Sequence, residues 1–139
     1  MLSFLVRSTG PGLGLTVAID HESRYHLEVP QEPLTINLHL PRDHDQPHVL
    51  SLEMWGKLDS YTVLDSQQKI LADRWLQFTD FTYDGIQLGY LFTESARYYH
   101  DFNGWGDETS QTFDCSMHFN GRVEWLIDQD PLLWLLELT

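Results

Sequence analysis

The sequence predicts an all-β fold, a two-layer antiparallel β-sandwich of the jelly-roll type with minor helix, for which a small β-barrel is the alternative. Apolar and polar residues alternate with a period of two in several windows, and turn signals such as Asp84-Gly85 recur between them. No long window shows the 3.6-residue period of a helix. The 139 residues suit one domain and contain no linker or repeat, so we expect a single domain over residues 1–139.

Four strands are predicted in the N-terminal half. Apolar side chains alternate with polar ones over residues 13–19, 25–29, 34–40 and 50–54. Each strand is expected to turn its apolar residues toward the core, because successive side chains point to opposite faces of a sheet. The glycine-rich residues 10–14 have no lysine and lead into a strand, so they predict a bend and not a phosphate-binding loop.

The C-terminal half adds a strand and a hairpin. Residues 75–83 are rich in aromatic side chains and threonine and end at Asp84-Gly85, which tolerates the positive φ of a tight turn. Asn120-Gly121 separates two alternating arms, residues 113–119 and 123–127. A two-residue Asn-Gly loop is typical of the type I′ turn, so these arms are predicted to pair as a β-hairpin.

Helix is expected to be minor. Residues 88–96 predict a turn or two of helix, and residues 132–138, after Asp130-Pro131, form either a short capped helix or a buried final strand. Cys115 alternates with apolar neighbours, which predicts an inert thiol in the core.

The chain is strongly acidic, with 21 acidic and 8 basic residues and a formal net charge of −13. Its basic residues are scattered singly, whereas a nucleic-acid-binding protein needs a basic stripe that displaces counterions from phosphates. The same charge repels an anionic membrane, and no apolar stretch has the length of a membrane span. We therefore expect that the chain binds neither nucleic acid nor a membrane. Its expected partner is a neutral or basic molecule, or a cation.

Cysteine usage and the N-terminus predict the compartment. The single Cys115 excludes an internal disulfide, which favours folding in a reducing compartment. Residues 1–7 lack the charged and apolar regions of a signal peptide. We expect the chain to fold in the cytoplasm. If it acts outside a cell, it is expected to get there by assembly into a particle such as a virion, by lysis or through a dedicated machine.

A loop over residues 100–108 is the first candidate binding site. Glycines flank Trp105, so its ring is predicted to stand in a loop as a flat apolar plate for a sugar ring or a partner side chain. Polar neighbours would hydrogen-bond around it, and one of the adjacent Tyr98 and Tyr99 should be exposed. The alternative is that Trp105 folds back to cap the sandwich. The candidate ligand-binding residues are Trp105, Asp101, Asn103, Asp107 and Tyr98.

Residues 42–48 are the second candidate site. Asp43 and Asp45 have the alternating spacing of calcium ligands, but an aspartate-rich turn between strands is ordinary turn chemistry. A zinc site from His44 and His48 is disfavoured, since no further ligand lies at a recognisable distance. No cofactor is expected, with calcium as the one candidate.

Catalytic motifs do not occur in the sequence. It has no Gly-x-Ser-x-Gly elbow, no phosphate-binding glycine loop and no His-Glu-x-x-His segment, and no pattern pairs its many carboxylates. We therefore expect a protein that is not an enzyme.

The alternating strands between about residues 34 and 127, the Asp84-Gly85 and Asn120-Gly121 turns and the acidic aromatic loop around Trp105 resemble two groups of proteins. These are small jelly-roll carbohydrate-binding modules, some of them calcium-dependent, and the β-sandwich accessory domains of bacteriophage virions. The resemblance is one of architecture, and it implies a recognition module that binds a glycan or protein subunits.

Three functional hypotheses follow. The first is a non-enzymatic recognition or assembly module, such as a virion component on a tail or capsid surface. The second is a stand-alone glycan-binding module. The third is an acidic inhibitor or immunity-type protein that masks a basic partner. Open sheet edges would also allow a homo-oligomer.

Overall fold

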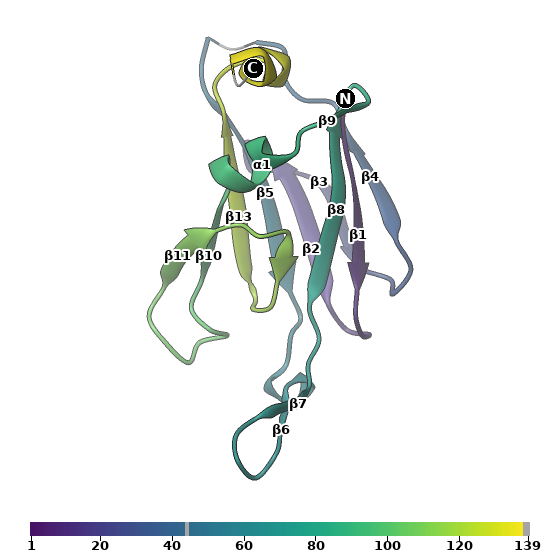
Figure 1. Cartoon of the computed structure of the whole chain (residues 1–139), viewed down its shortest axis with the longest axis vertical. Coiled ribbons are helices and arrows are strands. Elements are labelled where there is room, and N and C mark those ends of the chain that lie inside the picture. Colours follow the sequence, from purple (N-terminus) through teal and green to yellow (C-terminus); the bar gives the residue numbers. More distant parts are fainter. Residues whose placement is uncertain (44, 138–139) are drawn as a thin grey trace.

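The computed structural model describes residues 1–43 and 45–137 and contains two antiparallel β-sheets packed face to face, with two short helices (Figure 1). This arrangement confirms the predicted all-β sandwich with minor helix. Within the described residues no helix is long and apolar enough to cross a membrane.

The first sheet has the strand order β12-β8-β1-β4, with β9 paired to β8. The sequence correctly located β4 from its alternation and β8 from its aromatic and threonine residues, but it missed β1, which lies between β8 and β4. In β1 every second side chain, from Leu2 to Ser8, is buried. The bounds are β1 Leu2–Ser8, β4 Leu34–Leu38, β8 Leu76–Tyr83, β9 Ile86–Gln87 and β12 Ser116–Met117.

The second sheet has the order β11-β10-β13-β5-β2-β3. Four of its strands, β2, β3, β5 and β13, correspond to predicted windows, and the apolar residues of β2 and β5 face the core as expected. The outermost strand β3 is mostly exposed. The bounds are β2 Gly14–Ile19, β3 Glu22–Glu28, β5 His48–Trp55, β10 Arg97–His100, β11 Thr109–Thr112 and β13 Gly121–Ile127.

The core between the sheets is strongly aromatic. Phe81 stacks on Phe4 and on Phe92, with ring centroids 4.9 Å and 4.1 Å apart. Trp125 of β13 is fully buried against Phe92 and the half-buried Trp134. Together with the buried aliphatic residues around them, these rings remove apolar surface from water, which stabilises a domain without disulfides.

The segment predicted to contain a turn or two of helix is helical, and so is the C-terminal segment, for which helix and strand were both left open. The helix α1 spans Tyr90–Ser95, and α2 spans Pro131–Glu137, so the C-terminal segment is helix and not strand as far as the structure describes it. The side chain of Asp130 accepts a hydrogen bond from the backbone amide of Leu132 at 2.9 Å, and Pro131 occupies the first helical position. This is the start signal that the Asp-Pro pair indicated.

The predicted Asn120-Gly121 hairpin is wrong. β12 pairs with β8 in the first sheet, whereas β13 lies between β10 and β5 in the second. Neither Asn120 nor Gly121 has the positive φ that a type I′ turn requires. The dipeptide instead marks the point where the chain crosses from one sheet to the other.

Contacts with other parts of the chain explain why asparagine and glycine occupy positions 120 and 121. The side chain of Asn120 accepts a hydrogen bond from the backbone amide of Lys57 and donates one to its carbonyl, both at 3.0 Å. A Cβ atom at Gly121 would lie 2.3 Å from the carbonyl oxygen of Tyr99, so glycine permits the close approach of β13 to β10.

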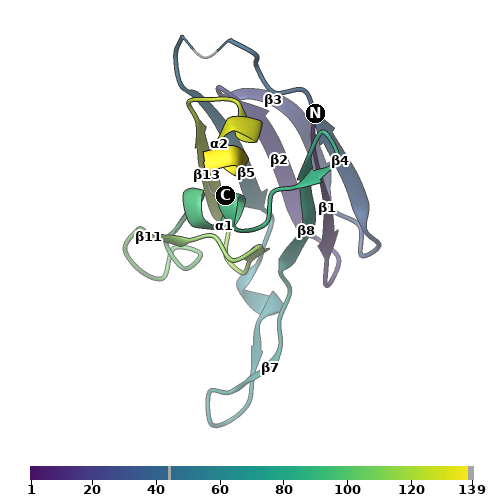
Figure 2. The ribbon, with the colours of Figure 1, turned by 45° about the horizontal axis from the view of Figure 1, so that its top comes forward.

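A long excursion between β5 and β8 projects from one end of the sandwich (Figures 1 and 2). We call residues 57–74 the arm. It contains the short 3₁₀ helix Asp59–Tyr61 and a small hairpin of β6 (Val63–Leu64) and β7 (Ile70–Ala72), which pair with each other in a two-stranded sheet of their own. The arm and the loop between β10 and β11 lie at the same end of the molecule.

Candidate functional site

Trp105 stands at the surface, as the glycines beside it indicated. The residue is 79 % exposed, and the indole Nε1 donates a hydrogen bond to the carboxylate of Asp59 in the arm at 3.1 Å. The ring therefore does not fold back to cap the sandwich, which was the alternative. This contact places the loop beside the arm.

The loop is shaped by its own backbone. Phe102, Asn103 and Gly104 all have positive φ values, of 56°, 58° and 89°. The amides of Gly104 and Gly106 donate to the carbonyl oxygen of Asp101 at 3.2 Å and 3.0 Å. Asparagine and glycine adopt this left-handed conformation more readily than other residues, so the local sequence favours the tight loop that presents the indole.

The polar candidates around Trp105 have different positions. The carboxylate of Asp101 accepts the Gly104 amide at 2.8 Å, and the amide oxygen of Asn103 accepts the Asn120 backbone amide at 2.7 Å, so both help to hold the loop. Asp107 is exposed. The loop therefore offers a ligand fewer free polar groups than its composition suggests.

Tyr98, which was among the predicted ligand-binding residues, does not lie at the surface. The residue is 1 % exposed, and its hydroxyl donates to the carbonyl of Phe119 and accepts the Phe119 amide at 2.9 Å. Burial raises the pKa of this phenol above its usual value. Of the adjacent pair, Tyr99 is the outward-facing residue, half-buried beneath the guanidinium of Arg122.

A pocket of about 300 Å³ lies between the loop and the arm. Trp105, Phe102 and Phe119 form its aromatic walls, and Leu64 of the arm adds an aliphatic one. Asp59, Thr62 and Asn103 supply its polar lining. The pocket can receive a largely apolar group, with a few polar contacts at its margin.

The arm itself exposes many apolar side chains. Ile70 is 64 % exposed and its neighbour Leu71 is 68 % exposed. Because adjacent residues of a strand point to opposite faces, the hairpin is uncovered on both sides. We define the arm–loop surface as the exposed apolar residues of the arm and the loop, namely Leu58, Val63, Leu64, Ile70, Leu71, Phe102 and Trp105.

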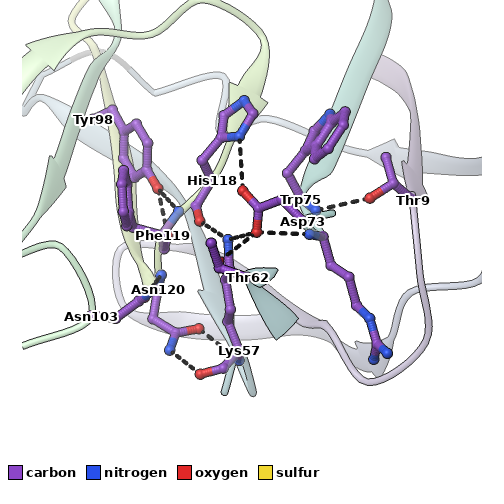
Figure 3. A network of polar contacts seen from close by, with 11 residues as sticks. Thr9, Lys57, Thr62, Asp73, Trp75, Tyr98, Asn103, His118, Phe119 and Asn120 are labelled. Carbon is purple, nitrogen blue, oxygen red and sulfur yellow. Dashed lines mark hydrogen bonds and ion pairs between the residues drawn. The ribbon is translucent and has the colours of Figure 1, made fainter. Parts of the chain in front are cut away.

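A buried ion pair joins the two ends of the arm (Figure 3). Lys57 Nζ lies 2.7 Å from the Asp73 carboxylate, and their side chains are 1 % and 12 % exposed. The lysine also donates to the carbonyl of His118, and the aspartate accepts from the hydroxyl of Thr62 at 2.7 Å. We call this group, with Asn120, the clamp.

Burial and the neighbouring hydrogen-bond donors shift the pKa of Asp73 in opposite directions. Burial raises its pKa, but hydrogen bonds from Lys57, Thr62 and the Arg74 amide together hold the pKa below its ordinary value. The carboxylate is therefore ionised at neutral pH, as the buried ammonium beside it requires. Sequence reasoning missed the clamp, because a lysine and an aspartate sixteen positions apart carry no recognisable spacing.

Of the two predicted calcium ligands, the Asp43 carboxylate accepts a hydrogen bond from the backbone amide of Asp45 at 2.9 Å. No group of three or more potential metal ligands gathers in the described part of the chain. His44, the other half of the disfavoured zinc pair, lies outside the described residues.

His48, the remaining member of that pair, is held by its neighbours. Its ring contacts the Asp20 carboxylate and the Asp43 carbonyl, both at 2.6 Å. The hydrogen bond with Asp20, together with that to Asp43, raises the pKa of His48. The residue therefore joins the turn between β2 and β3 to the segment that precedes β5.

The Cys115 thiol is half-buried, with a positive backbone φ of 68° in the turn before β12. Burial, and secondarily the charge of Asp114, raise its pKa. A thiol in this state is a poor nucleophile at neutral pH.

Comparison with known proteins adds no relative from which a role can be transferred: no family model matches the chain, and no match was found among curated proteins or solved structures.

Proposed function

We propose that this chain is a non-enzymatic recognition and assembly module that attaches to other protein subunits through the arm–loop surface. The observation that carries the proposal is the exposure of Trp105, Ile70 and Leu71 at one end of the molecule, at 79 %, 64 % and 68 %. Large apolar groups gathered at one place on a soluble protein are typical of interaction sites.

The construction of the arm supports the same function. An isolated two-stranded hairpin is marginally stable in water, and this one is apolar on both faces. The clamp holds its two ends to the sandwich and so reduces the ordering that binding would otherwise require. A partner that covered the hairpin would supply the packing that the chain itself does not provide.

The resemblance to accessory domains of bacteriophage virions suggests which assembly the chain joins. We propose that this assembly is a virion, with the chain on its tail or capsid surface. Trp105 fits such a role because tryptophan is over-represented among the residues that dominate binding energy at protein interfaces. The acidic charge of −13 makes a nucleic-acid role inside a particle unfavourable.

Site-specific photo-cross-linking in the source cells tests the proposal. A cross-linking residue at position 71 should give adducts of discrete mass, whereas the same residue at the exposed position of Thr35 on the outer face of β4 should not. The second variant Trp105→Ala should reduce the adducts from position 71. Equal adduct patterns from positions 71 and 35 would refute an interface at the arm.

A glycan-binding module is the second candidate function, and the exposed indole beside the pocket favours it. Sugar rings stack on tryptophan, and Asp59 and Asn103 lie at the margin of the pocket to receive hydroxyl groups. The two functions separate by mutation. Glycan binding, measured on an array and by calorimetry, should be lost in Trp105→Ala and retained in Leu71→Glu, whereas subunit binding should be weakened by both.

A further inference from the structure

We propose that the partner of the arm is a second copy of this chain, bound head to tail, with the arm of one copy packed on the α2 end of the next. This inference rests on the proposed assembly function. By the α2 end we mean the end of the sandwich opposite the arm, with the exposed residues Leu126, Asp128, Leu133 and Glu137.

The charge of the arm suits an acidic partner. The arm contains three basic residues, Lys57, Lys69 and Arg74, and three acidic ones, Asp59, Asp65 and Asp73. The rest of the chain therefore carries the whole net charge of −13. Two copies that met through their sandwich faces would repel each other, whereas the neutral arm can approach an acidic copy without that repulsion.

The tip of the arm combines apolar and basic groups. Lys69 directly precedes Ile70 and Leu71, is exposed, and takes part in no ion pair with the residues that the structure describes. The Asp65 carboxylate is turned inward and accepts the amides of Gln67 and Lys69, each at 2.8 Å. The tip therefore presents two aliphatic side chains with a cation beside them.

The α2 end has the complementary character. Leu126 and Leu133 are 52 % and 51 % exposed. Glu137 lies four residues after Leu133 and so shares its face of the helix. After Arg122 the sequence contains four acidic residues and no basic one. An aliphatic side chain placed on Leu133 with Lys69 beside it would bring the ammonium near Glu137.

The positions of the two surfaces determine the kind of assembly. Figure 1 places the arm and α2 at opposite ends of the longest axis of the molecule. An interface between two different surfaces is heterologous, so each copy can bind one neighbour at either end. Repetition of the contact gives a closed ring or a filament and not a two-fold dimer.

Sedimentation velocity of the purified full chain, from micromolar to near-millimolar concentration, tests this arrangement. The wild-type chain should form species larger than a dimer. Leu71→Glu and Leu133→Glu should each remain monomeric, with association weakened by about tenfold or more. Because both positions are exposed, the variants should keep the wild-type circular dichroism spectrum and thermal midpoint. Thr35→Glu adds the same charge elsewhere and should assemble normally.

A mixture of the two variants gives the decisive result. Leu71→Glu retains a normal α2 end and Leu133→Glu retains a normal arm, so together they should form a heterodimer that grows no further. In the same way Lys69→Glu should weaken assembly, and mixing it with Glu137→Lys should restore pairing.

Three results would overturn the proposal: a wild-type chain that stays monomeric over the whole range, a Leu133→Glu variant that assembles normally, or a variant mixture that does not pair. The failure of this inference is distinguishable from that of the assembly function. A monomeric wild-type chain whose position 71 cross-links to a different protein would refute self-association alone. A monomeric chain without specific adducts would refute both.

Discussion

Replacing Asp73 by asparagine tests the clamp, because it removes one charge of a buried ion pair while keeping the shape of the side chain. Lys57 is 1 % exposed at its side chain and would be left with the His118 carbonyl and the amide oxygen of the introduced asparagine as its nearest acceptors. Leaving a buried charge without its partner costs about 3–5 kcal/mol in other proteins. For Asp73→Asn we expect the free energy of unfolding to fall by about 3 kcal/mol, at the lower end of this range, because the asparagine oxygen can still accept hydrogen bonds.

That loss is large against the total stability of about 5–15 kcal/mol that is usual for a domain, and it corresponds to a fall in the thermal midpoint of about 6–12 °C. Urea unfolding followed by tryptophan fluorescence measures it. Hydrogen exchange of the amides in residues 63–72 should also become faster, because the arm loses its anchor. The double variant Lys57→Met with Asp73→Asn should cost less than the sum of the single variants by about 1–3 kcal/mol.

The same variant changes the response to acid. The pKa of Asp73 is lowered in the folded state, so its stabilising contribution is complete above the ordinary value of 3.8 and is lost as the pH falls through the lowered value. Asp73→Asn should therefore lose less stability than the wild type as the pH falls below that ordinary value. A cost below about 1 kcal/mol, or additive effects in the double variant, would refute a clamp based on charge pairing.

Three further predictions test other parts of the structure. Trp105→Ala should change the free energy of unfolding by less than about 0.5 kcal/mol, and a larger loss by urea unfolding would place the ring in the core. Gly121→Ala should cost about 1–3 kcal/mol in the same assay, because the new Cβ meets the Tyr99 carbonyl; an unchanged midpoint would contradict the close approach of β13 to β10. NMR titration should give His48 a pKa above its ordinary 6.5, and Asp20→Asn should bring it back down. The His48 contribution to stability should be complete below the ordinary value of 6.5 and lost as the pH rises through the raised value, and an unshifted His48 would exclude the Asp20 contact in solution.

Alternation predicted strands well where one face of a strand is buried and the other is wet. Over β2, β4 and β5 the apolar positions read from the sequence are the ones that reach the core. Hydrophobicity alone does not indicate burial in the arm, where the large apolar residues Val63, Leu64 and Ile70 are exposed. The sequence indicates that an apolar side chain prefers to be buried. Only the tertiary structure shows whether the chain supplies a surface that covers it.

The errors at Asn120 and Tyr98 have a different physical origin. The Asn-Gly turn signal is local in sequence. The side chain of Asn120, however, hydrogen-bonds the backbone of Lys57, which is distant in sequence. The dipeptide therefore lies where the chain crosses between the sheets and does not form a hairpin turn. Tyr98 and Tyr99 occupy opposite faces of β10, and nothing in the sequence indicates which face is covered. Trp105 was predictable, because flanking glycines cannot build a strand around an indole.

The position of the clamp explains how an apolar hairpin can project from an acidic domain without collapsing onto it. Lys57 and Asp73 stand at the two ends of the arm, so one buried ion pair fixes both points at which the chain leaves the sandwich. The hydrogen bond between Trp105 and Asp59 then restrains the arm from the side of the loop. A hairpin held only by its own few backbone hydrogen bonds would lose much of its order in water, and binding would have to restore that order. Fixing its base lowers in advance the entropic cost that the proposed binding would otherwise carry.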